Sequence, residues 1–573
     1  MLPGGGAMHL NDSLGRCDSV RYICNLHEQG GAIAAEAYGQ YAGLGVVMVT
    51  TGPGGTNAIT GVAGAWLEST PMLVISGQVK TADLAGGRGV RQIGFQEIDI
   101  VRIVKPITKY AAIVSEPNRI RAILEEAVWF ATNGRKGPVW VDLPMDVQTA
   151  QVVPESLDGF TPPIKDREEV SRIAESVART VELLATARRP VVLAGNGIRH
   201  AGAIDVFLSW AERIGIPILT TWKALDFLPE VHPLFVGRPG IVGQRAANFA
   251  QQTSDLFISI GARLDYGQTA YDHANFAPKA RKVIVDIDPA ELSKLKMGIS
   301  VPLAADAGDF LCELDRATRV ACLPDWTGWM RRCADWKSRY PIVSASPPMA
   351  QRGIDNYVLV DTIGRLLRAG DVLVPGSSGA CSEITAQAVP VVKGIRFINT
   401  HGLGAMGFGI PAALGACLAS GGMRTVCIDG DGGFPMNSQE LAIIANLGLP
   451  IKFFVLHNGG YGSIKATQTN YFEGRYVACD PASGLVFPDI EATAKSCGIL
   501  FSRIDSPVGL VTKLHKILSS PGPGICDVIM AKHQLTQPKV VSRQEADGSM
   551  VTAPMEDMWP FLDRSELAKI LTE

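Results

Sequence analysis

Two polar loops, each following an apolar run, lie one helix apart between residues 425 and 460 and constrain the fold most strongly. The runs 425–429 and 451–456 predict two buried parallel strands, and a helix is expected between them over 438–445. The loops 430–433 and 457–460 follow the two strands. Because the carboxyl ends of parallel strands meet at one edge of an open α/β sheet, we expect both loops at a single ligand-binding edge.

These loops carry oxygen ligands that suit magnesium, which prefers near-octahedral coordination and often binds together with substrate phosphates. The Asp431 carboxylate, the Asn458 side-chain amide and the Gly460 carbonyl would supply about half of that coordination, and a diphosphate would supply most of the rest. Asp-Gly and Asn-Gly are also ordinary turn signals, so plain turns are the alternative interpretation. The glycines that would let a diphosphate approach the backbone are Gly430, Gly432 and Gly433.

Length and composition indicate a large globular protein. A chain of 573 residues is expected to hold about three or four domains. The net charge of −3 gives no electrostatic reason to expect nucleic acid or a membrane as a partner. No apolar run approaches a membrane span and the N-terminus lacks signal-peptide features, so we expect a cytoplasmic protein. The eleven cysteines show no zinc-type spacing, which fits free thiols in a reducing compartment.

The first part of the chain places a carboxylate at a predicted strand end. A short strand is expected over 22–26, with Glu28 just after it and a helix over 31–42. The next strand is predicted over 46–50, and the glycine-rich turn 52–57 leads into another helix. Taken alone, Glu28 would be interpreted as a helix-capping or solvated carboxylate.

Four distinctive strings occur in this part of the chain: HEQ at 27–29, AAEAYGQYAG at 34–43, TTGPGGTNAITGVAGAWLESTPMLVISGQV at 50–79 and IGFQEIDI at 93–100. In this order they resemble the acetolactate synthase group of thiamin diphosphate-dependent decarboxylases and carboligases. The resemblance covers nearly the whole chain. It implies an α/β fold with three doubly wound parallel-sheet domains. The first would bind the pyrimidine of the cofactor, the second would be the middle domain, and the third would bind the diphosphate.

The resemblance also implies roles for residues of the first domain. Glu28 would hydrogen-bond the aminopyrimidine of thiamin and promote the tautomer that removes the thiazolium C2 proton. Phe95 and Gln96 would lie near the reacting carbon, although simple core packing is the alternative for Phe95. Pro53 and Asn57, in the glycine-rich turn, would contact the cofactor.

In the last domain the resemblance places Asp431, Asn458 and the Gly460 carbonyl in the magnesium positions. His457 stands where the family usually has the first of two consecutive asparagines. Because the second asparagine is the one that meets the metal, the predicted site is retained.

The segment 402–409 resembles the part of these enzymes where a bulky residue bends thiamin. Met406 would be that wedge, with the Gly404 carbonyl and the Met406 amide meeting the pyrimidine; ordinary core packing of Met406 is the alternative. Further contacts to the cofactor are expected from Ser377, Ser378, Gly462, Ser463 and Ile464.

The middle of the chain has glycine loops and acidic strand ends that suit a nucleotide. GAR, DIDP and the segment 306–309 resemble the FAD-binding segments of acetolactate synthase, so FAD is expected, with ADP or an empty spacer domain as the alternatives. The candidate nucleotide-binding residues are Gly195, Gly197, Gly261, Arg263, Asp286 and Asp306.

Proline-rich stretches at 154–165 and 344–352 are the predicted linkers. Family members usually have one more helix and strand ahead of residue 3, so we expect that the numbering starts late or that the first domain is short. The tail is expected to pack over the site entrance. The predicted units are the pyrimidine-binding domain 1–153, the middle domain 166–343, the diphosphate- and magnesium-binding domain 353–535 and the tail 536–573.

These features predict decarboxylation of a 2-oxo acid such as pyruvate and transfer of the two-carbon unit to a second carbonyl. Glu28 and the loop 430–433 belong to different domains, and the resemblance places them in different subunits, so a homodimer or homotetramer is expected. The alternatives are an acetolactate synthase, a simple decarboxylase, a flavin oxidase of the same fold and a non-enzymatic regulatory relative.

The acceptor is expected to be larger than pyruvate. In acetolactate synthases a Met and a Trp stand at the positions of Ser463 and Thr467, and that indole lines the acceptor pocket. The smaller side chains here predict room for a bulkier ketone, such as a nucleotide-linked 4-keto-deoxysugar. The acetyl-transferring carboligases of branched-chain sugar biosynthesis offer a similar case.

Overall fold

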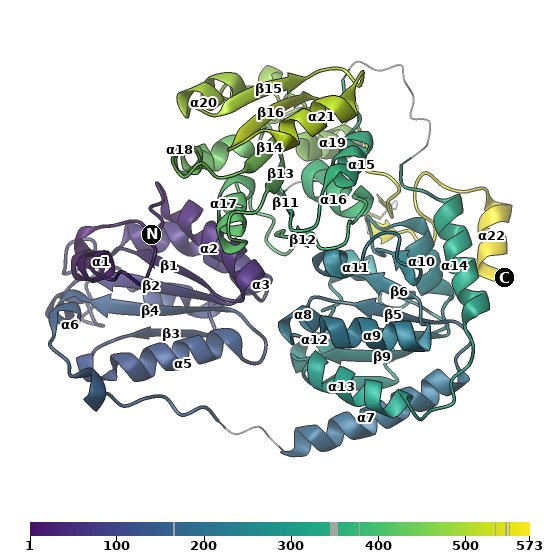
Figure 1. The fold of residues 1–573 in the computed structure, drawn as a ribbon, viewed down its shortest axis with the longest axis horizontal. Helices are drawn as coiled ribbons and strands as arrows, with labels where there is room; N and C mark the ends of the chain where they lie inside the picture. Colours follow the sequence, from purple (N-terminus) through teal and green to yellow (C-terminus); the bar gives the residue numbers. More distant parts are fainter. Residues whose placement is uncertain are drawn as a thin grey trace.

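The computed structural model describes residues 1–163, 167–343, 353–377, 379–532, 534–544, 547–548 and 550–572. They form three parallel sheets flanked by helices, one in each of three domains (Figure 1). This arrangement confirms the predicted α/β fold class. None of the helices in these ranges has the length and apolar character needed to cross a membrane.

The first domain has a four-stranded sheet in the order β1-β2-β4-β3. Helix α2 (Glu28–Ala42) packs both on α3 (Pro53–Leu67) of this domain and on α17 (Gly409–Ala419) of the third domain, as Figure 1 shows. Small residues allow this close approach, since a Cβ at Gly415 would lie 2.0 Å from the Ala34 carbonyl oxygen. The strands and the remaining main helix are β1 (Gly45–Val49), β2 (Met72–Gln78), β3 (Tyr110–Ile113), β4 (Pro138–Pro144) and α5 (Ile120–Thr132).

The predicted strand over 22–26 is wrong. This segment joins no sheet, and residues 1 and 2 lie beside it where a neighbouring strand would be needed. The Met1 amino group donates to the Ile23 carbonyl (2.6 Å), and the Asn25 amide donates to the Met1 carbonyl (2.9 Å). Leu2 in turn donates to the carbonyl of Met48 in β1 (3.2 Å).

The middle domain has a six-stranded parallel sheet in the order β10-β9-β8-β5-β6-β7. Its core is rich in aromatic side chains, including the fully buried Phe207, Trp210 and Phe257. The strands are β5 (Pro190–Ala194), β6 (Ile218–Thr220), β7 (Phe235–Gly237), β8 (Leu256–Ile260), β9 (Arg281–Asp286) and β10 (Val301–Ala304). The main helices are α7 (Arg167–Thr186), α9 (Ile204–Ile214), α10 (Arg245–Thr253), α13 (Ala307–Thr318) and α14 (Thr327–Arg339).

The third domain has a six-stranded parallel sheet in the order β12-β11-β13-β14-β16-β15. The chain runs from β11 to β12 on one side and returns to β13 on the other, so the strand order reverses between β11 and β13, where ligands bind in such sheets. The strands are β11 (Val372–Pro375), β12 (Arg396–Phe397), β13 (Thr425–Gly430), β14 (Ile451–His457), β15 (Leu500–Ile504) and β16 (Gly524–Ile529). The main helices besides α17 are α15 (Asn356–Leu366), α16 (Gly379–Ala388), α19 (Gly462–Tyr471), α20 (Ile490–Ser496) and α21 (Leu510–Ser519).

The helix predicted over 438–445 begins earlier and is broken. A 3₁₀ helix, η7 (Phe434–Glu440), precedes the short α18 (Leu441–Asn446). Asn437 has φ −132°, which is not helical, so one regular helix cannot span the segment.

The C-terminal tail packs on the middle domain, beside α10 and α14 (Figure 1). Met555, Met558 and Ile570 join the apolar core of that domain, and the Asn248 side chain donates to the Met555 carbonyl (2.8 Å). We expected the tail over the site entrance, whereas these contacts fix it to the middle domain. Its elements are β17 (Ser542–Gln544), β18 (Met550–Thr552) and α22 (Arg564–Thr572).

Candidate active site

Glu28 is the first residue of α2 and is buried, with 6% of its surface exposed. Its Oε2 accepts a hydrogen bond from the Asn57 side-chain amide (3.0 Å). Asn57 lies in the first turns of α3, which begins at Pro53, so the first-domain candidates predicted from sequence meet at one place. His27 fixes the start of α2 because its Nδ1 accepts from the Gln29 amide (3.1 Å).

Phe95 and Gln96 lie beside the start of α3. Gly52 has φ +59°, and a Cβ there would lie 2.4 Å from the Gln96 carbonyl oxygen, so only glycine permits this approach. Phe95 is 86% exposed, which rules out core packing in this chain. The buried Glu97 holds the loop in shape, since its carboxylate accepts from the Ile93 amide (2.8 Å).

Glu440, which sequence reasoning missed, connects the N-terminal end of α2, where Glu28 lies, to the third domain. Its Oε1 accepts from the amides of Leu26 (3.1 Å) and His27 (3.2 Å), and its Oε2 accepts from the Asn25 side chain (2.9 Å). Burial raises the pKa of Glu440, and these donors oppose that rise. An acid inside an apolar helical stretch was the only sequence signal for this contact.

The two predicted metal loops lie at the carboxyl ends of the adjacent strands β13 and β14. Asp431 joins them directly, because its Oδ2 accepts from the amides of Asn458 (3.0 Å) and Gly459 (2.7 Å). Gly460 has φ +156°, and a Cβ there would lie 2.2 Å from the Cys479 carbonyl oxygen. The loop therefore needs glycine at this position.

The chemistry of this loop cluster fits magnesium. Asp431 Oδ1 is buried and has no hydrogen-bond partner among the described residues, although buried polar atoms are normally satisfied. A cation held by this oxygen, the exposed Asn458 side chain and the Gly460 carbonyl would satisfy it. Burial raises the pKa of Asp431, and a bound cation would favour the ionised carboxylate. No described cluster of three or more His, Cys, Asp or Glu residues offers an alternative metal site.

A diphosphate would meet two helix N-termini beside these loops. Helices α16 and α19 begin next to each other, since a Cβ at Gly379 would lie 2.8 Å from Ser463 Oγ. Helix N-termini favour anions. Ser377 precedes α16, and Ser378 lies outside the described residues. A Cβ at Gly432 would lie 2.5 Å from the Tyr461 ring, one at Gly433 would lie 2.9 Å from Asp429, and one at Gly430 would lie 3.5 Å from Cys381.

Helix α19 carries the predicted acceptor residues Ser463 and Thr467. Gly462, Ser463, Ile464 and Thr467 are all exposed, and α19 has no buried residue. The Thr467 hydroxyl donates to the Ser463 carbonyl (3.1 Å). Ser463 and Thr467 are therefore small, exposed side chains that carry hydroxyl groups.

The predicted wedge loop lies against the diphosphate loop. Gly404 has φ +62°, and its nearest neighbour for an added Cβ is the Ser377 carbonyl oxygen, at 3.7 Å. The Asn437 side chain donates to the Gly407 carbonyl (2.8 Å) and fixes the end of the loop. Met406 is half-buried and lies outside the apolar core clusters of the described residues.

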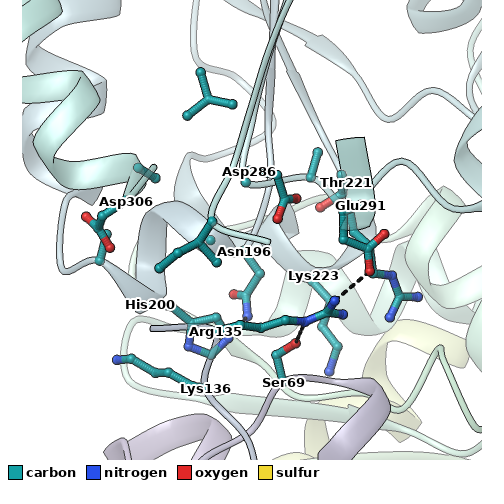
Figure 2. A pocket seen from close by; sticks show the side chains of 18 of the residues that line it. Ser69, Arg135, Lys136, Asn196, His200, Thr221, Lys223, Asp286, Glu291 and Asp306 are labelled. Atoms are coloured by element: carbon teal, nitrogen blue, oxygen red, sulfur yellow. Dashed lines mark hydrogen bonds and ion pairs between the residues drawn. The ribbon is translucent and has the colours of Figure 1, made fainter. Parts of the chain in front are cut away.

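A second site is a cavity of about 940 Å³ whose walls come from all three domains (Figure 2). Gly195 is not part of the wall, because it packs beneath it: a Cβ there would lie 2.1 Å from the Gly261 carbonyl oxygen. Burial raises the pKa of Asp286 at the end of β9. The predicted nucleotide-binding residues that do line the cavity are Gly197, Gly261, Arg263, Asp286 and Asp306.

Sequence reasoning missed the cavity walls that come from outside the glycine loops. Arg135 and Lys136 reach in from the first domain, and His401 reaches in from the third. Arg135 closes one side, donating to Asp288 and Glu291 of the middle domain (2.7 Å each). A basic pair between two glycines was the only sequence signal for the first wall.

The candidate active-site residues form two separate groups within one chain. Glu28 meets Asn57 in the first domain, and Asp431 meets the Asn458 loop in the third. No hydrogen bond or ion pair in the described ranges joins the Glu28 carboxylate to Asp431 or Asn458.

Three family models match this chain: "Thiamine pyrophosphate enzyme, N-terminal TPP binding domain" over residues 1–103, the central domain over 177–314 and the C-terminal TPP binding domain over 377–528. The chain is 33% identical to the acetolactate synthase large subunit of Lactococcus lactis, covering 95% of this chain and 92% of the relative. It is 35% identical to that of Corynebacterium glutamicum, covering 99% and 89%. Each matched model falls in a different one of the three domains: the central match contains all six strands of the middle sheet, and the predicted metal loops lie within the C-terminal match. The chain therefore belongs to the thiamine pyrophosphate enzymes, among the members similar to acetolactate synthase large subunits.

Proposed function

We propose that this protein uses thiamin diphosphate and magnesium to decarboxylate a 2-oxo acid, pyruvate in the first instance, and transfers the two-carbon unit to a ketone. The observation that carries the proposal is the buried Asp431 Oδ1, which has no hydrogen-bond partner in the described part of the chain and is set among Asn458, Gly460 and two helix N-termini. The names of the similar acetolactate synthases support the same class of chemistry.

Each candidate residue would have a physical task. Asp431, Asn458 and the Gly460 carbonyl would hold magnesium, and Met406 would bend the cofactor. Bound thiamin diphosphate supplies the electron sink for decarboxylation. Glu28, oriented by its hydrogen bond from Asn57, would exchange a proton with the aminopyrimidine nitrogen.

Exclusion of water would protect the reacting centre. Phe95 is 86% exposed, and its loop is held by Glu97 and by the contact of Gln96 with Gly52 at the start of α3. Burial of Phe95 against the substrate would remove water from the site and strengthen its electrostatic interactions.

The acceptor we propose is a ketone larger than pyruvate, such as a nucleotide-linked 4-keto-deoxysugar. Support comes from the exposed hydroxyls of Ser463 and Thr467, which leave open space where a bulky side chain would restrict the acceptor. Acetolactate synthase activity is the second candidate, favoured by the identity of the similar proteins.

Product identification decides between these acceptors. Pyruvate is supplied alone and then with a panel of ketones, including keto-sugars, and the products are identified by mass spectrometry. We expect coupled products with a larger ketone to outcompete acetolactate. Efficient acetolactate formation at the expense of every larger acceptor would leave acetolactate synthase as the function, and release of free aldehyde alone would indicate a simple decarboxylase.

We also propose FAD as the occupant of the middle-domain cavity. Its volume of about 940 Å³, its glycine walls at Gly197 and Gly261 and the carboxylate of Asp286 support a dinucleotide. The purified protein should then be yellow, with a flavin that takes no net electrons during turnover. An absorption spectrum without flavin bands in protein reconstituted with FAD would rule out this occupant.

A further inference from the structure

Lys223 is a half-buried lysine at the meeting point of the three domains. It follows β6 in the middle domain, lines the cavity of Figure 2, and has 16% of its side chain exposed. Its ammonium lies 2.9 Å from Glu68 Oε2 and donates to the side chain of Gln40 (2.9 Å), both in the first domain. It also donates to the carbonyl of Asn399 in the third domain (2.5 Å).

Glu68 continues this link to the loop that contains Met406. Its other carboxylate oxygen, Oε1, accepts a hydrogen bond from the amide of Gly402, four residues before Met406. Burial alone would raise the pKa of Glu68, but the Lys223 ammonium and the Gly402 amide outweigh burial and hold its pKa below the ordinary value. The ion pair of Lys223 and Glu68 thus contacts the backbone at Gly402, where the loop that contains Met406 begins.

Glu36 completes the cluster from α2, the helix that begins at Glu28. The Gln40 amide donates both to Glu36 (3.1 Å) and to the Asn399 carbonyl (3.1 Å). One lysine faces two buried carboxyl groups, those of Glu36 and Glu68, and a buried charge is costly unless it is paired. Loss of the Lys223 charge would leave the buried Glu68 carboxylate without its ion-pair partner at the point where the three domains meet.

The cavity wall includes the same root of the wedge loop. His401, immediately before Gly402, packs edge-on against Trp222, with ring centroids 4.8 Å apart, and both line the cavity together with Lys223. A ligand that contacts this wall therefore orders the residues from which the wedge loop starts.

We propose that Lys223 is a positioning residue that holds the Met406 loop for thiamin diphosphate, and that a ligand in the middle-domain cavity strengthens cofactor binding through it. The inference rests on the proposed use of thiamin diphosphate and adds a route between the two sites. Coupling of this kind is reciprocal and is commonly worth about 5- to 150-fold in affinity.

The test compares four variants with the wild-type full chain. Lys223→Met removes the charge while keeping the length of the side chain, Lys223→Arg keeps the charge, and Glu68→Gln removes the carboxylate that holds Gly402. The matched control is Lys282→Met, because Lys282 is a buried lysine of the same domain that donates to two carbonyls, those of Ala277 (2.9 Å) and Ala280 (3.2 Å), away from the cavity.

Affinity for thiamin diphosphate is measured by calorimetry at fixed magnesium, with and without saturating FAD, and with ADP as a second probe. In the wild type we expect FAD to tighten cofactor binding, and in Lys223→Met we expect the affinity to fall by about tenfold and the effect of FAD to vanish. Lys223→Arg should retain part of the effect, Glu68→Gln should lose it, and Lys282→Met should match the wild type. Circular dichroism checks that each variant folds.

The inference is overturned if Lys223→Met binds the cofactor as Lys282→Met does, or if neither FAD nor ADP alters cofactor affinity in the wild type. Should Lys223→Met not fold, an unchanged coupling in Glu68→Gln would overturn it in the same way. Absence of thiamin diphosphate binding in the wild type would instead refute the proposed function itself, and the inference would fall with it.

Discussion

At the scale of single residues, the Glu28 carboxylate depends on Asn57 for its orientation. We expect Glu28→Gln to keep the fold and the cofactors but to lower turnover by about 10²- to 10⁴-fold, the usual worth of general acid–base catalysis. Steady-state kinetics and a calorimetric titration of the cofactor would be compared with the wild type. Retention of more than half of the wild-type turnover would exclude this role for Glu28.

Asp431 offers an independent residue-scale prediction. Its Oδ2 is satisfied by two amides, while its Oδ1 has no partner in the described ranges. Asp431→Ala should weaken magnesium and thiamin diphosphate together, because each completes the coordination of the other. The measurement is cofactor affinity as a function of magnesium concentration. Equal affinity of the wild type in excess chelator would contradict the metal role.

Glu36 gives a dependence on pH. Burial raises the pKa of Glu36 from 4.5 to about 8, with the nearby Lys223 opposing the rise. A carboxyl whose pKa is higher in the folded state stabilises the fold fully at low pH, and that contribution is lost as pH rises from about 4.5 to about 8. Glu36→Gln mimics the protonated form and does not titrate. The melting temperature of Glu36→Gln relative to that of the wild type should therefore increase as the pH rises through this window.

The control for this titration is the exposed Glu155→Gln, which removes a surface carboxylate. Melting curves of the wild type, Glu36→Gln and Glu155→Gln would be compared between about pH 5 and about pH 8, because the contribution of Glu36 to stability changes over this range. A difference between Glu36→Gln and the wild type that does not change with pH would show that Glu36 does not hold a proton in the folded protein.

At the scale of elements, the connection from β14 to α19 is a glycine-dependent loop. Gly459 and Gly460 both have positive φ, of 75° and 156°, but an added Cβ at Gly459 meets nothing within 4 Å, whereas one at Gly460 meets the Cys479 carbonyl at 2.2 Å. Gly459→Ala should cost about 1–2 kcal/mol of backbone strain. Gly460→Ala should cost more and should weaken magnesium, because the neighbouring backbone must shift.

Chemical denaturation and magnesium titration of the two variants would test this difference. The pair is matched because the substitutions are identical and adjacent. Equal losses of stability and metal affinity would mean that the close approach to Cys479 has no role in forming the site.

At the scale of the whole molecule, the two groups of catalytic candidates lie in different domains of one chain. If the complete site forms between two subunits, Glu28→Gln and Asp431→Ala chains should complement each other when co-expressed. A mixed dimer would contain one site with both lesions and one with neither, so random pairing restores about a quarter of wild-type activity. Activity would be measured on co-purified, differently tagged chains. Absence of recovery in verified mixed dimers would place the site within a single chain.

The periodicity of the sequence determined much of this architecture. Buried apolar runs alternating with helices predicted parallel sheets, and the loops after β13 and β14 had to meet because adjacent parallel strands end at one edge. The Asp431 and Asn458 loops were therefore predictable without any tertiary information. The same reasoning was wrong for the segment 22–26. A run of this kind becomes a strand only beside a free sheet edge, and residues 1 and 2 lie between this segment and β1.

Only the tertiary structure decided which distant residues would share a site. Lys223, Glu68 and Gly402 come from three domains, and no local propensity specifies their contacts. The same is true of Glu440, whose carboxylate holds the backbone before Glu28. Hydrophobic periodicity reports which face of an element is buried, whereas contacts between domains depend on how those faces fit together. For that reason the sequence determined most of the elements and the position of the loops proposed to bind magnesium, and the packing of the three domains decided the cavity and the network around it.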